Sequence, residues 1–399
     1  MDNQASITRR LFLDRLGIGG CSLAGLPLLS SGALAAPAAK AGSGGAGVAP
    51  NLSAIDGGMP PEADYALDQP PPGFAQYGEN HAFWFFDKDN KVHGYTHLEA
   101  FQDWFPLKND RTWLALPDGR VLYNWTEGFQ SSPRKPAGAN SFYECVEPFR
   151  RWSVNYLGTM QISSADELRR GRPTAGSRAL VRYHLDVVTA APPFPQGKLG
   201  MAPSAEVLNA IGGTRYEQLF RVTGTVHIDN ETIELAGAGV RTHRQGLRNM
   251  TGWHGHSWQT ALFPSGRGFH LYVNPGSDGP EGRAKPMYAE AVVLHEGTLH
   301  PAEVLQCSWL DSYSAHGDRS QIRLRSKLGE AVIDAEILAS VWRTFHIKSA
   351  PGRHLNGYGV WGDPGSFPNN QGAARYTWDG ETTIGQVERS TAIEFLPKA

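Results

Sequence analysis

The chain has 399 residues, of which 40% are hydrophobic and 19% charged, a balance typical of globular proteins. Its formal net charge is −2, and no run of like charges is long enough to follow a nucleic-acid backbone or a lipid surface, so nucleic acid is excluded as an expected partner. The 46 glycines and 27 prolines indicate many turns and few long helices, which favours β structure. The length predicts two domains, with one large β domain carrying extensions as the alternative.

Residues 1–35 have the features of an export signal. The twin-arginine pattern TRRLFL occupies residues 8–13, an apolar region follows, and the small-residue motif ALA at 33–35 is typical of a cleavage site. We therefore expect a signal peptide carried by the twin-arginine export machinery, and a mature protein in the periplasm. A membrane anchor is the alternative, but charged residues 14–15 interrupt the apolar region, which is too short for stable membrane insertion. A lipid anchor on Cys21 is a second alternative.

Residues 36–72 are rich in alanine, glycine and proline and are expected to form a flexible leader without chemistry. Cleavage after the signal would leave two cysteines, Cys145 and Cys307, which an oxidising compartment would allow to form one disulfide. The sequence does not decide whether they are close enough to do so. It contains no CxxC zinc motif.

From Tyr77 onward, short β-branched and aromatic runs alternate with glycine, aspartate and asparagine, the pattern of strands joined by tight turns. Residues 191–214 contain the best internal boundary and one short helix near 205–211. The predicted strands and hairpins before this boundary are residues 81–101, 111–125 (turning at Asp118-Gly119), 149–160 and 179–190. Those after it are residues 216–239, 257–273, 290–302 and 322–337, turning near Asp229-Asn230, Ser265-Gly266, Glu296-Gly297 and Leu328-Gly329.

Two consecutive antiparallel meanders close most economically into two β-barrels or packed sheets, because closure removes unpaired strand edges. We therefore predict an all-β fold. A barrel of about eight strands is wide enough to hold one small ligand. The pattern thus permits a buried apolar binding cavity without requiring one.

The segment 239–260, GVRTHRQGLRNMTGWHGHSWQT, gathers three histidines, three arginines and two tryptophans. His254 and His256 stand two apart, so on a strand they share one face, as metal-binding HxH pairs do. With His243 or His270 they would complete a three-histidine metal site. The alternative is a solvated or hydrogen-bonded histidine beside a turn glycine, with no carboxylate at a diagnostic spacing.

Acid/base chemistry is a second interpretation of the same segment. A histidine such as His256 at the start of a strand, in an aromatic cavity, has a pKa open to tuning near neutrality. Glu217, Glu290 and Glu388 lie within aromatic or apolar runs, and a buried carboxylic acid that stays protonated donates a proton. Alternatively, each glutamate pairs with an arginine at a barrel rim, such as Arg241, Arg248 or Arg389.

Two other enzyme classes are excluded by context. There is no GxSxG motif, and Ser257 lacks the strand-turn-helix setting that exposes a nucleophilic serine. No GxGxxG motif opens a helix, so the glycines of GAGVRTHRQG are turn residues rather than a phosphate-binding loop.

Several runs of the second half together resemble a tandem lipocalin-like family. They are YEQLFRVTGTVHID, GAGVRTHRQGLR, WHGHSWQTALFPSGRGFH, MYAEAVVLHEGTLHPAEVLQCSWL and YTWDGETTIGQVERS, and the resemblance covers roughly residues 75–397. The family includes hydroxyneurosporene synthase, AttH-like proteins and, more distantly, fungal decalin-forming Diels-Alderases. Many members carry an Arg-Asp-His-Ser-Trp-Gly run, of which Arg241, His243 and Gly246 are present here.

The resemblance implies two antiparallel lipocalin-like (calycin) barrels packed side by side, with few short helices and a hydrophobic cavity. We place the amino-terminal lipocalin-like domain at 73–200 and the carboxy-terminal one at 201–399. The cavity would accept a terpenoid, steroid or polyketide-like molecule. The expected partner is therefore a small hydrophobic molecule.

The leading hypothesis is an exported enzyme performing cofactor-independent acid/base chemistry, namely hydration or dehydration, isomerisation or cyclisation, on a hydrophobic substrate. His256 is the expected acid or base and Glu290 its carboxylate partner or a second acid, while Arg241 and His243 would orient them or stabilise developing charge. Neither a metal nor a cofactor is expected. The remaining expected substrate contacts are Trp253, Trp258, Tyr288, Glu217, Trp378 and Glu388. The alternatives are a periplasmic carrier without catalysis and a metal-dependent enzyme using His254 and His256.

Overall fold

The computed structural model describes residues 50–71, 77–100, 105, 107–129, 132–173, 176–199, 207, 213–247, 252–313, 316–350 and 353–397. The expected signal peptide lies outside these residues, as does all but Val207 of the helix expected near 205–211. The helical elements are short: α2 (Ala165–Arg169), η2 (Pro61–Asp64), η3 (Glu281–Ala284) and η4 (Ile393–Phe395). Among the described residues, no helix is long and apolar enough to cross a membrane.

Strands of the first half close into a barrel in the order β1-β2-β3-β4-β6-β7-β9-β10. The barrel is closed because β10 pairs with β9 on one side and with β1 on the other, from Tyr77 opposite Leu247 to Asp87 opposite Gly237. Strand β5 pairs with β6, and β8 pairs with β9. The bounds are β1 (Tyr77–Asp87), β2 (His93–Ala100), β3 (Leu107–Ala115), β4 (Arg120–Phe129), β5 (Ser141–Glu147), β6 (Arg151–Ser164), β7 (Arg178–Thr189), β8 (Phe194–Pro195), β9 (Thr214–Ile228) and β10 (Glu231–Leu247).

The second half closes in the same way, in the order β11-β12-β13-β14-β15-β16-β18-β19. Strand β19 pairs with β11, and the long β16 pairs with β15, β17 and β18 along different stretches. The bounds are β11 (Gly255–Leu262), β12 (Gly268–Asn274), β13 (Tyr288–His295), β14 (Thr298–Gln306), β15 (Arg319–Ser326), β16 (Gly329–Ala350), β17 (Arg353–Tyr358), β18 (Ser366–Trp378) and β19 (Glu381–Thr391).

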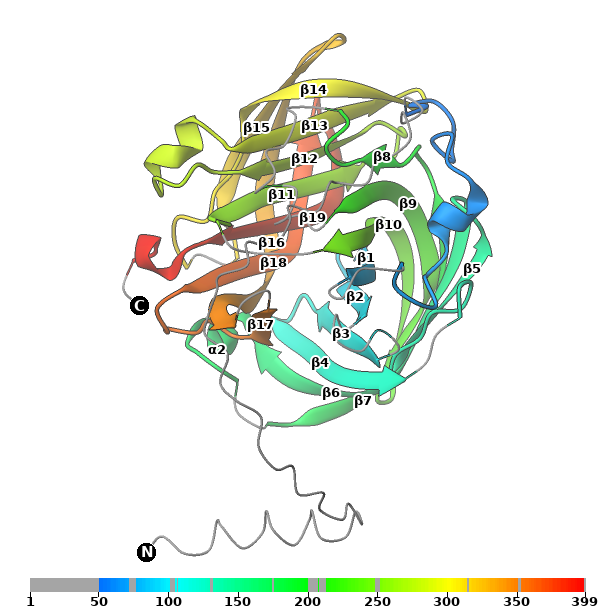
Figure 1. Ribbon diagram of the computed structural model, residues 1–399. Helices are drawn as coiled ribbons and strands as arrows, with labels where there is room; N and C mark the ends of the chain where they lie inside the picture. Colours follow the sequence, from blue (N-terminus) through cyan, green and yellow to red (C-terminus); the bar gives the residue numbers. More distant parts are fainter. Residues whose placement is uncertain are drawn as a thin grey trace, which may run out of the picture. The chain divides into compact units, whose positions relative to one another are not determined.

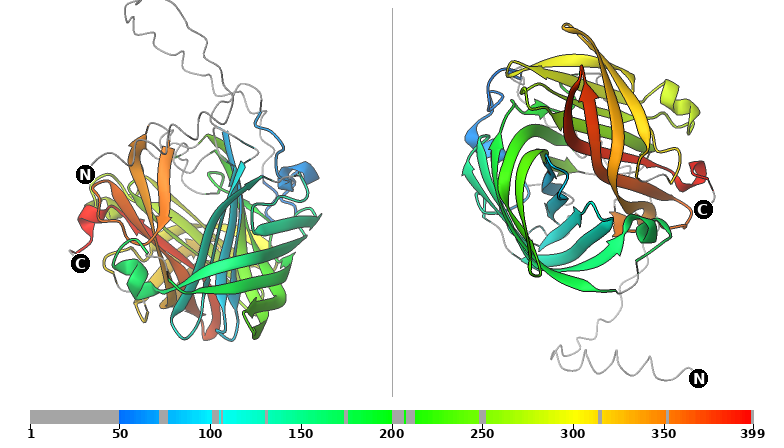
Figure 2. Two further views of the ribbon diagram at one scale, coloured as in Figure 1. Left: turned by 90° about the horizontal axis from the view of Figure 1, so that it is seen from below. Right: turned by 180° about the vertical axis from the view of Figure 1, so that it is seen from behind.

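Alternation of side chains along the strands produces three large apolar cores among the described residues, besides a small cluster around Trp253 and Phe345. In β1, Phe83 and Phe85 point into the first barrel, whereas Trp84 and Phe86 point outward. A separate core fills the second barrel. The third core lies between the barrels, where Trp84 meets Trp258 edge-on with ring centroids 4.8 Å apart. Strands β1 and β10 therefore face β11 and β19, and the barrels lie side by side (Figures 1 and 2).

The prediction of an all-β fold with two adjacent barrels is confirmed, and the predicted turns join successive strands. Gly119, for example, has a φ of 88° in the turn between β3 and β4. The boundary between the two barrels differs from the one expected at 200/201. Strands β9 and β10 follow that position in the sequence, yet they complete the first barrel. The change of barrel falls between Leu247 and Gly255. The turn patterns did not show where the first barrel ends, because closure of that barrel depends on β10 pairing with β1 from the other end of the domain.

The expected flexible leader is part of the folded body where it is described. Residues 50–71 include η2, and Asp64 at its end is fully buried. The Asp64 carboxylate accepts hydrogen bonds from Arg241 Nη1 (2.6 Å) and Trp152 Nε1 (3.1 Å) inside the first barrel. The prediction of a flexible leader is therefore wrong for these residues. Its proline-rich composition reflects a short 3-10 turn with proline at its start.

The two cysteines do not form a disulfide. Cys145 is buried in the core of the first barrel, and Cys307 packs against the core of the second, so both are free. Burial raises the pKa of each thiol to about 12, which keeps them protonated and unreactive.

Tyr358 contributes a hydrogen bond from the second barrel to the first. Its hydroxyl donates to the backbone carbonyl of Thr112 (2.9 Å), and its ring contacts Tyr123 (centroids 4.5 Å apart). Tyr358→Phe is expected to lower the free energy of unfolding by about 1–2 kcal/mol, because the ring stays but a buried carbonyl loses its donor. Urea unfolding measures this. The matched Tyr313→Phe, at a half-buried ring, should change it by about 0.5 kcal/mol or less, and equal losses would contradict the prediction.

Candidate functional site

A row of polar and aromatic side chains crosses the outer face of the second barrel where it meets the first. The strand register places Glu290 opposite Tyr272, Tyr272 opposite Trp258, and Trp258 opposite Glu388. Residues opposite one another in a ladder lie on the same face of the sheet, so these four side chains stand in line. None is more than 5% exposed. Glu217, from β9 of the first barrel, reaches this row at Trp258.

The Glu217 carboxylate lies at the junction of the barrels among three different partners. Its Oε2 accepts a hydrogen bond from Trp258 Nε1 (3.0 Å) and lies 3.1 Å from His270 Nδ1. Its Oε1 lies 2.6 Å from Arg215 Nη2. The Arg215 guanidinium also stacks over the rings of Trp258 (4.4 Å) and Tyr272 (5.5 Å). This one cation therefore contacts both the Glu217 carboxylate and two aromatic faces.

Burial gives Glu217 and His270 unusual protonation equilibria. It raises the pKa of Glu217 to about 7, although Arg215 and the Trp258 N–H act in the opposite direction. Burial, assisted by the charge of Arg215, lowers the pKa of His270 well below its usual range. Near neutral pH, Glu217 is therefore divided between its acid and its carboxylate, while His270 is neutral. A protonated Glu217 can donate to His270 Nδ1, and this arrangement suits general acid/base catalysis.

Glu290 lies in the same region and is held by the first barrel. Its Oε2 accepts hydrogen bonds from Tyr288 OH (2.9 Å) and from the backbone N–H of Gly197 (2.7 Å), and burial raises its pKa. Its Oε1 is buried and has no hydrogen-bond partner among the described residues, and neither do the Gln196 amide or Trp84 Nε1.

His256 belongs to a second, fully paired group on the same face. Its Nε2 lies 3.2 Å from Glu388 Oε1, and its Nδ1 lies 2.6 Å from Ser390 Oγ. Glu388 also accepts hydrogen bonds from Asn369 (2.8 Å) and Gln371 (2.7 Å). Burial alone would raise the pKa of Glu388, but the hydrogen bond and charge of His256 outweigh it and lower the pKa to about 2. Glu388 is thus a permanent carboxylate that positions His256.

The expected pairing of His256 with Glu290 is therefore replaced by His256 with Glu388. The ring of Tyr272 lies between the two groups, stacked on His256 with centroids 5.4 Å apart and at 6.3 Å from Tyr288. Trp253 contacts the other side of His256, with centroids 5.4 Å apart. Of the expected contacts, the structure brings Trp253, Trp258, Tyr288, Glu217 and Glu388 together with His256 and Glu290.

Arg241 and His243 lie elsewhere, on the inner face of the first barrel. They sit opposite Phe83 and His81 of β1, whose side chains point inward, whereas Thr242 points toward the second barrel. Arg241 forms an ion pair with Asp64 (2.6 Å), and His243 Nε2 lies 2.9 Å from Glu79 Oε1. The expectation that they orient His256 and Glu290 is corrected, because the intervening barrel wall separates them.

Trp378 also lies apart from the site. It belongs to the interior core of the second barrel and stacks with Arg267 (4.5 Å). The salt-bridge alternative holds for Glu217, but with Arg215 (2.6 Å), since Arg241 pairs with Asp64 and Arg389 with Asp318 (3.0 Å). Arg248 lies outside the described residues.

The predicted metal site at His254 and His256 is not assembled by the described residues. Both ring nitrogens of His256 are engaged by Ser390 and Glu388, and His270 faces Glu217. Within the described ranges, the three-donor group that could hold a metal is a different one, Glu79, His81 and His243 in the first barrel.

The sequence interpretation missed Arg215 and Tyr272 as parts of the site, and it considered His270 only as a metal ligand. Arg215 and Glu217 stand two apart on β9, and His270 and Tyr272 stand two apart on β12. The two-residue repeat of a strand therefore predicts that each pair shares a face. No sequence signal, however, identifies which faces of the two barrels meet. Asp64 and Glu79 were missed because they lie far from the histidine-rich segment in the sequence.

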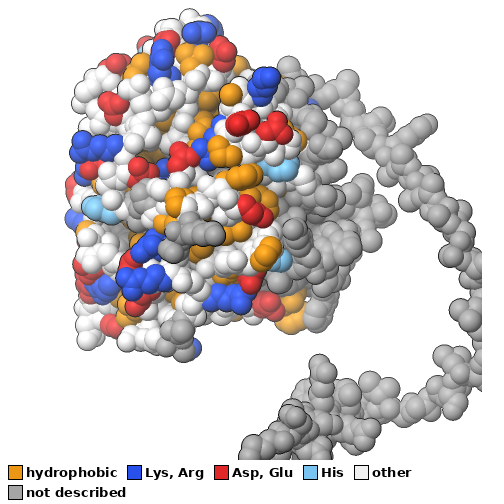
Figure 3. Space-filling model, turned by 90° about the vertical axis from the view of Figure 1, so that its left-hand side faces the viewer, with side chains coloured by type: hydrophobic (Ala, Val, Ile, Leu, Met, Phe, Trp, Pro, Cys, Tyr) orange, Lys and Arg blue, Asp and Glu red, His pale blue; other side chains and the backbone are white. Residues whose placement is uncertain are grey.

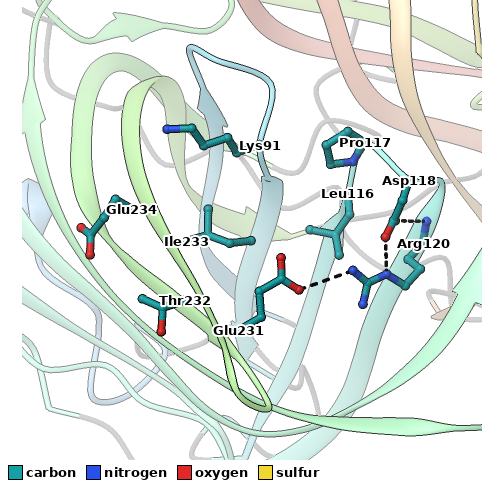
Figure 4. A pocket seen from close by; sticks show the side chains of 9 residues that line it. All are labelled: Lys91, Leu116, Pro117, Asp118, Arg120, Glu231, Thr232, Ile233 and Glu234. Atoms are coloured by element: carbon teal, nitrogen blue, oxygen red, sulfur yellow. Dashed lines mark hydrogen bonds and ion pairs between the residues drawn. The ribbon is translucent and has the colours of Figure 1, made fainter.

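Two surface features do not coincide with this site. A hollow of about 650 Å³ opens at the far end of the first barrel, among the turns before β2, β4 and β10, where Arg120 links Asp118 and Glu231 (Figure 4). On the face in Figure 3, acidic and basic side chains are interspersed without a large area of one charge. The proton-handling groups are instead buried between the barrels.

Comparison with solved structures finds similar folds at low identity. A putative AttH from Nitrosomonas europaea is 13% identical, with a TM-score of 0.49 over 82% of this chain and 99% of that one. CghA is 11% identical, with a TM-score of 0.46 over 80% and 89% of the two chains. Kievitone hydratase from Nectria haematococca is 10% identical, with a TM-score of 0.44 over 81% and 90%.

Comparison with curated proteins gives no match. One family profile matches residues 61–393, which span both barrels and begin at η2. The chain therefore belongs to the family described as "Domain of unknown function (DUF7064)".

Proposed function

We propose that the protein is an enzyme that performs acid/base chemistry on a hydrophobic small molecule, of terpenoid, steroid or aromatic class, with Glu217 as the proton-exchanging group. The observation that carries this proposal is a buried carboxylic acid whose pKa lies at about 7, in contact with a neutral histidine and with the indole N–H of Trp258. Glu388, the carboxylate that contacts the other histidine of the site, His256, has its pKa lowered instead.

The geometry supports proton transfer to an unsaturated carbon. Protonated Glu217 delivers its proton to one carbon of a double bond, forming a C–H bond and leaving a cation on the neighbouring carbon. Arg215, which lies over the rings of Trp258 and Tyr272 and beside Glu217, stabilises the carboxylate that remains. Loss of a different proton back to Glu217 completes an isomerisation, whereas addition of water and loss of its proton completes a hydration.

The test is incubation of the full chain with a panel of unsaturated terpenoids, steroids and aromatic polyketides in D₂O and, separately, in H₂¹⁸O. We expect solvent deuterium on carbon in the product, and ¹⁸O as well if the reaction is hydration. Glu217→Gln should lower the initial rate by about 10²- to 10⁴-fold, the usual contribution of a general acid. The matched control Glu234→Gln, at an exposed position on β10, should leave the rate unchanged.

Three results would count against the proposal. A product formed equally fast by Glu217→Gln would exclude Glu217 as the acid. A product without solvent deuterium on carbon would exclude protonation of the double bond. Recovery of every compound unchanged, with some of them bound, would favour the alternative of a periplasmic carrier without catalysis.

A further inference from the structure

We propose that the interior of the first barrel binds one divalent transition-metal ion through Glu79, His81 and His243. This site is separate from the acid/base site, because its side chains point into the barrel rather than toward the second one. Glu79 and His81 stand two apart on β1, so they share its inner face, and His243 lies directly opposite His81 on β10. All three are buried, with 2–3% exposure, and their ligand atoms lie within 4.8 Å of one another.

The donor set and its spacing suit a metal ion. Two imidazoles and one carboxylate are typical ligands of Zn²⁺ and Fe²⁺. Metal–ligand bonds of about 2.0–2.2 Å place neighbouring donor atoms about 3–3.5 Å apart. Glu79 Oε1 lies 2.9 Å from His243 Nε2 and 3.9 Å from His81 Nε2, distances that bracket this range. A small rotation of the His81 ring would close the longer distance.

The hydrogen bonds around His243 prepare Nε2 as a ligand. Its Nδ1 lies 3.2 Å from the backbone carbonyl of Ala63 and donates to it, a contact that also orients metal-bound histidines in other proteins. Its Nε2 then carries a lone pair and lies 3.1 Å from the Gln245 amide nitrogen, which also donates to Glu79 Oε1 (3.0 Å). A carboxylate oxygen 2.9 Å from this nitrogen favours a positive group at the same place, either a proton or a metal ion, and a metal ion would displace the Gln245 amide from His243.

The surroundings of His81 favour a metal ion over a proton between Glu79 and His243. Its Nε2 is buried and has no hydrogen-bond partner among the described residues, although its ring stacks on His243 with centroids 3.9 Å apart. A proton shared by Glu79 and His243 would leave His81 Nε2 unsatisfied, whereas a metal ion would satisfy all three donors. Arg241 on the same inner face is already paired with Asp64 (2.6 Å), so it does not neutralise Glu79.

The experiment uses the full chain purified without a histidine tag, stripped with a chelator and titrated with Co²⁺ and then Zn²⁺. We expect one Co²⁺ per chain with visible ligand-field absorption, displaced by Zn²⁺. His81→Phe should weaken binding on the order of 100-fold or more, since it removes a ligand but no hydrogen bond from Nε2. The matched control His93→Phe replaces another buried histidine of the same barrel and should bind like the parent.

His81→Asn provides a second variant in case phenylalanine at this position prevents folding, which circular dichroism would show. Stoichiometric binding that both His81 variants retain would overturn the proposal. So would a folded parent chain that takes up neither metal. Because His81 is not part of the acid/base site, these outcomes are independent of the activity assay for Glu217.

Discussion

Replacing Asp64 with alanine is expected to lower the free energy of unfolding by about 3–5 kcal/mol, the usual effect of removing one member of a buried ion pair. Asp64 is fully buried, and the Arg241 side chain that it neutralises is only 1% exposed. Burial by itself lowers the pKa of Arg241, but Asp64 more than compensates and raises it, so the guanidinium stays charged. Without Asp64, that charge remains buried beside the uncharged Gln218 oxygen and Tyr216 hydroxyl. The other groups that would lose their acceptor are Trp152 Nε1, Tyr216 OH and the Phe149 N–H.

Urea unfolding at pH 7, followed by tryptophan fluorescence, measures this loss. Asp56→Ala is the matched control, because Asp56 is an exposed aspartate of the same segment that accepts only a local hydrogen bond from the Gly58 N–H (2.8 Å). It should cost about 1 kcal/mol or less. The double variant Asp64→Ala with Arg241→Met should lose less than the sum of the single losses, because it removes both charges. A loss below about 1 kcal/mol for Asp64→Ala would show that the pair does not hold the segment in place.

The stability of the protein is expected to fall as the pH rises through the window set by Glu217. In the folded state its pKa is about 7, above the ordinary value of 4.5, so the folded chain binds this proton more tightly than the unfolded chain. The contribution is fully present below pH 4.5 and is lost as the pH rises toward 7. A shift of this size corresponds to about 3 kcal/mol.

Comparison with Glu217→Gln isolates this effect from the other titrating groups. Glutamine cannot ionise, so the difference in unfolding free energy, variant minus parent, should become more positive by about 3 kcal/mol between pH 4 and pH 8. Any constant cost of the substitution cancels in this comparison. Glu234→Gln, at an exposed site, should show no such trend. A difference that stays flat across this range would mean that Glu217 ionises like an ordinary carboxylate.

The fold was predictable because its determinants are local. Each hairpin is indicated by a turn such as Asp118-Gly119 or Glu296-Gly297 between alternating apolar runs. Closure into β-barrels follows from the need to pair strand edges. The boundary between the barrels was not predictable in the same way. It depends on β10 pairing with β1, a contact between residues about 160 positions apart that leaves no trace in a turn pattern.

The site was predicted in part. His256, Trp258 and Glu290 share one face of the second barrel, as alternation along the strands predicts, whereas Glu217 reaches them from the first barrel, which alternation does not predict. Arg241 and His243 lie in the same histidine-rich segment as His256, yet their side chains point into the interior of the first barrel, away from the site. Alternation shows that Arg241 and Thr242 face opposite ways, but both faces of β10 are buried, one by the first barrel core and one by the second barrel. Hydrophobicity therefore could not distinguish the two faces.

By itself, the sequence determined the all-β class, the positions of the turns and which side chains share a strand face, since these follow from backbone propensity and a two-residue repeat. It also predicts twin-arginine export, which stays a prediction. Only the tertiary structure decided which faces meet, and hence that Glu217 joins His270, His256 joins Glu388, and Glu79 joins His243. The physical reason is that burial and charge pairing set the pKa of a group, and both depend on neighbours far away in the sequence.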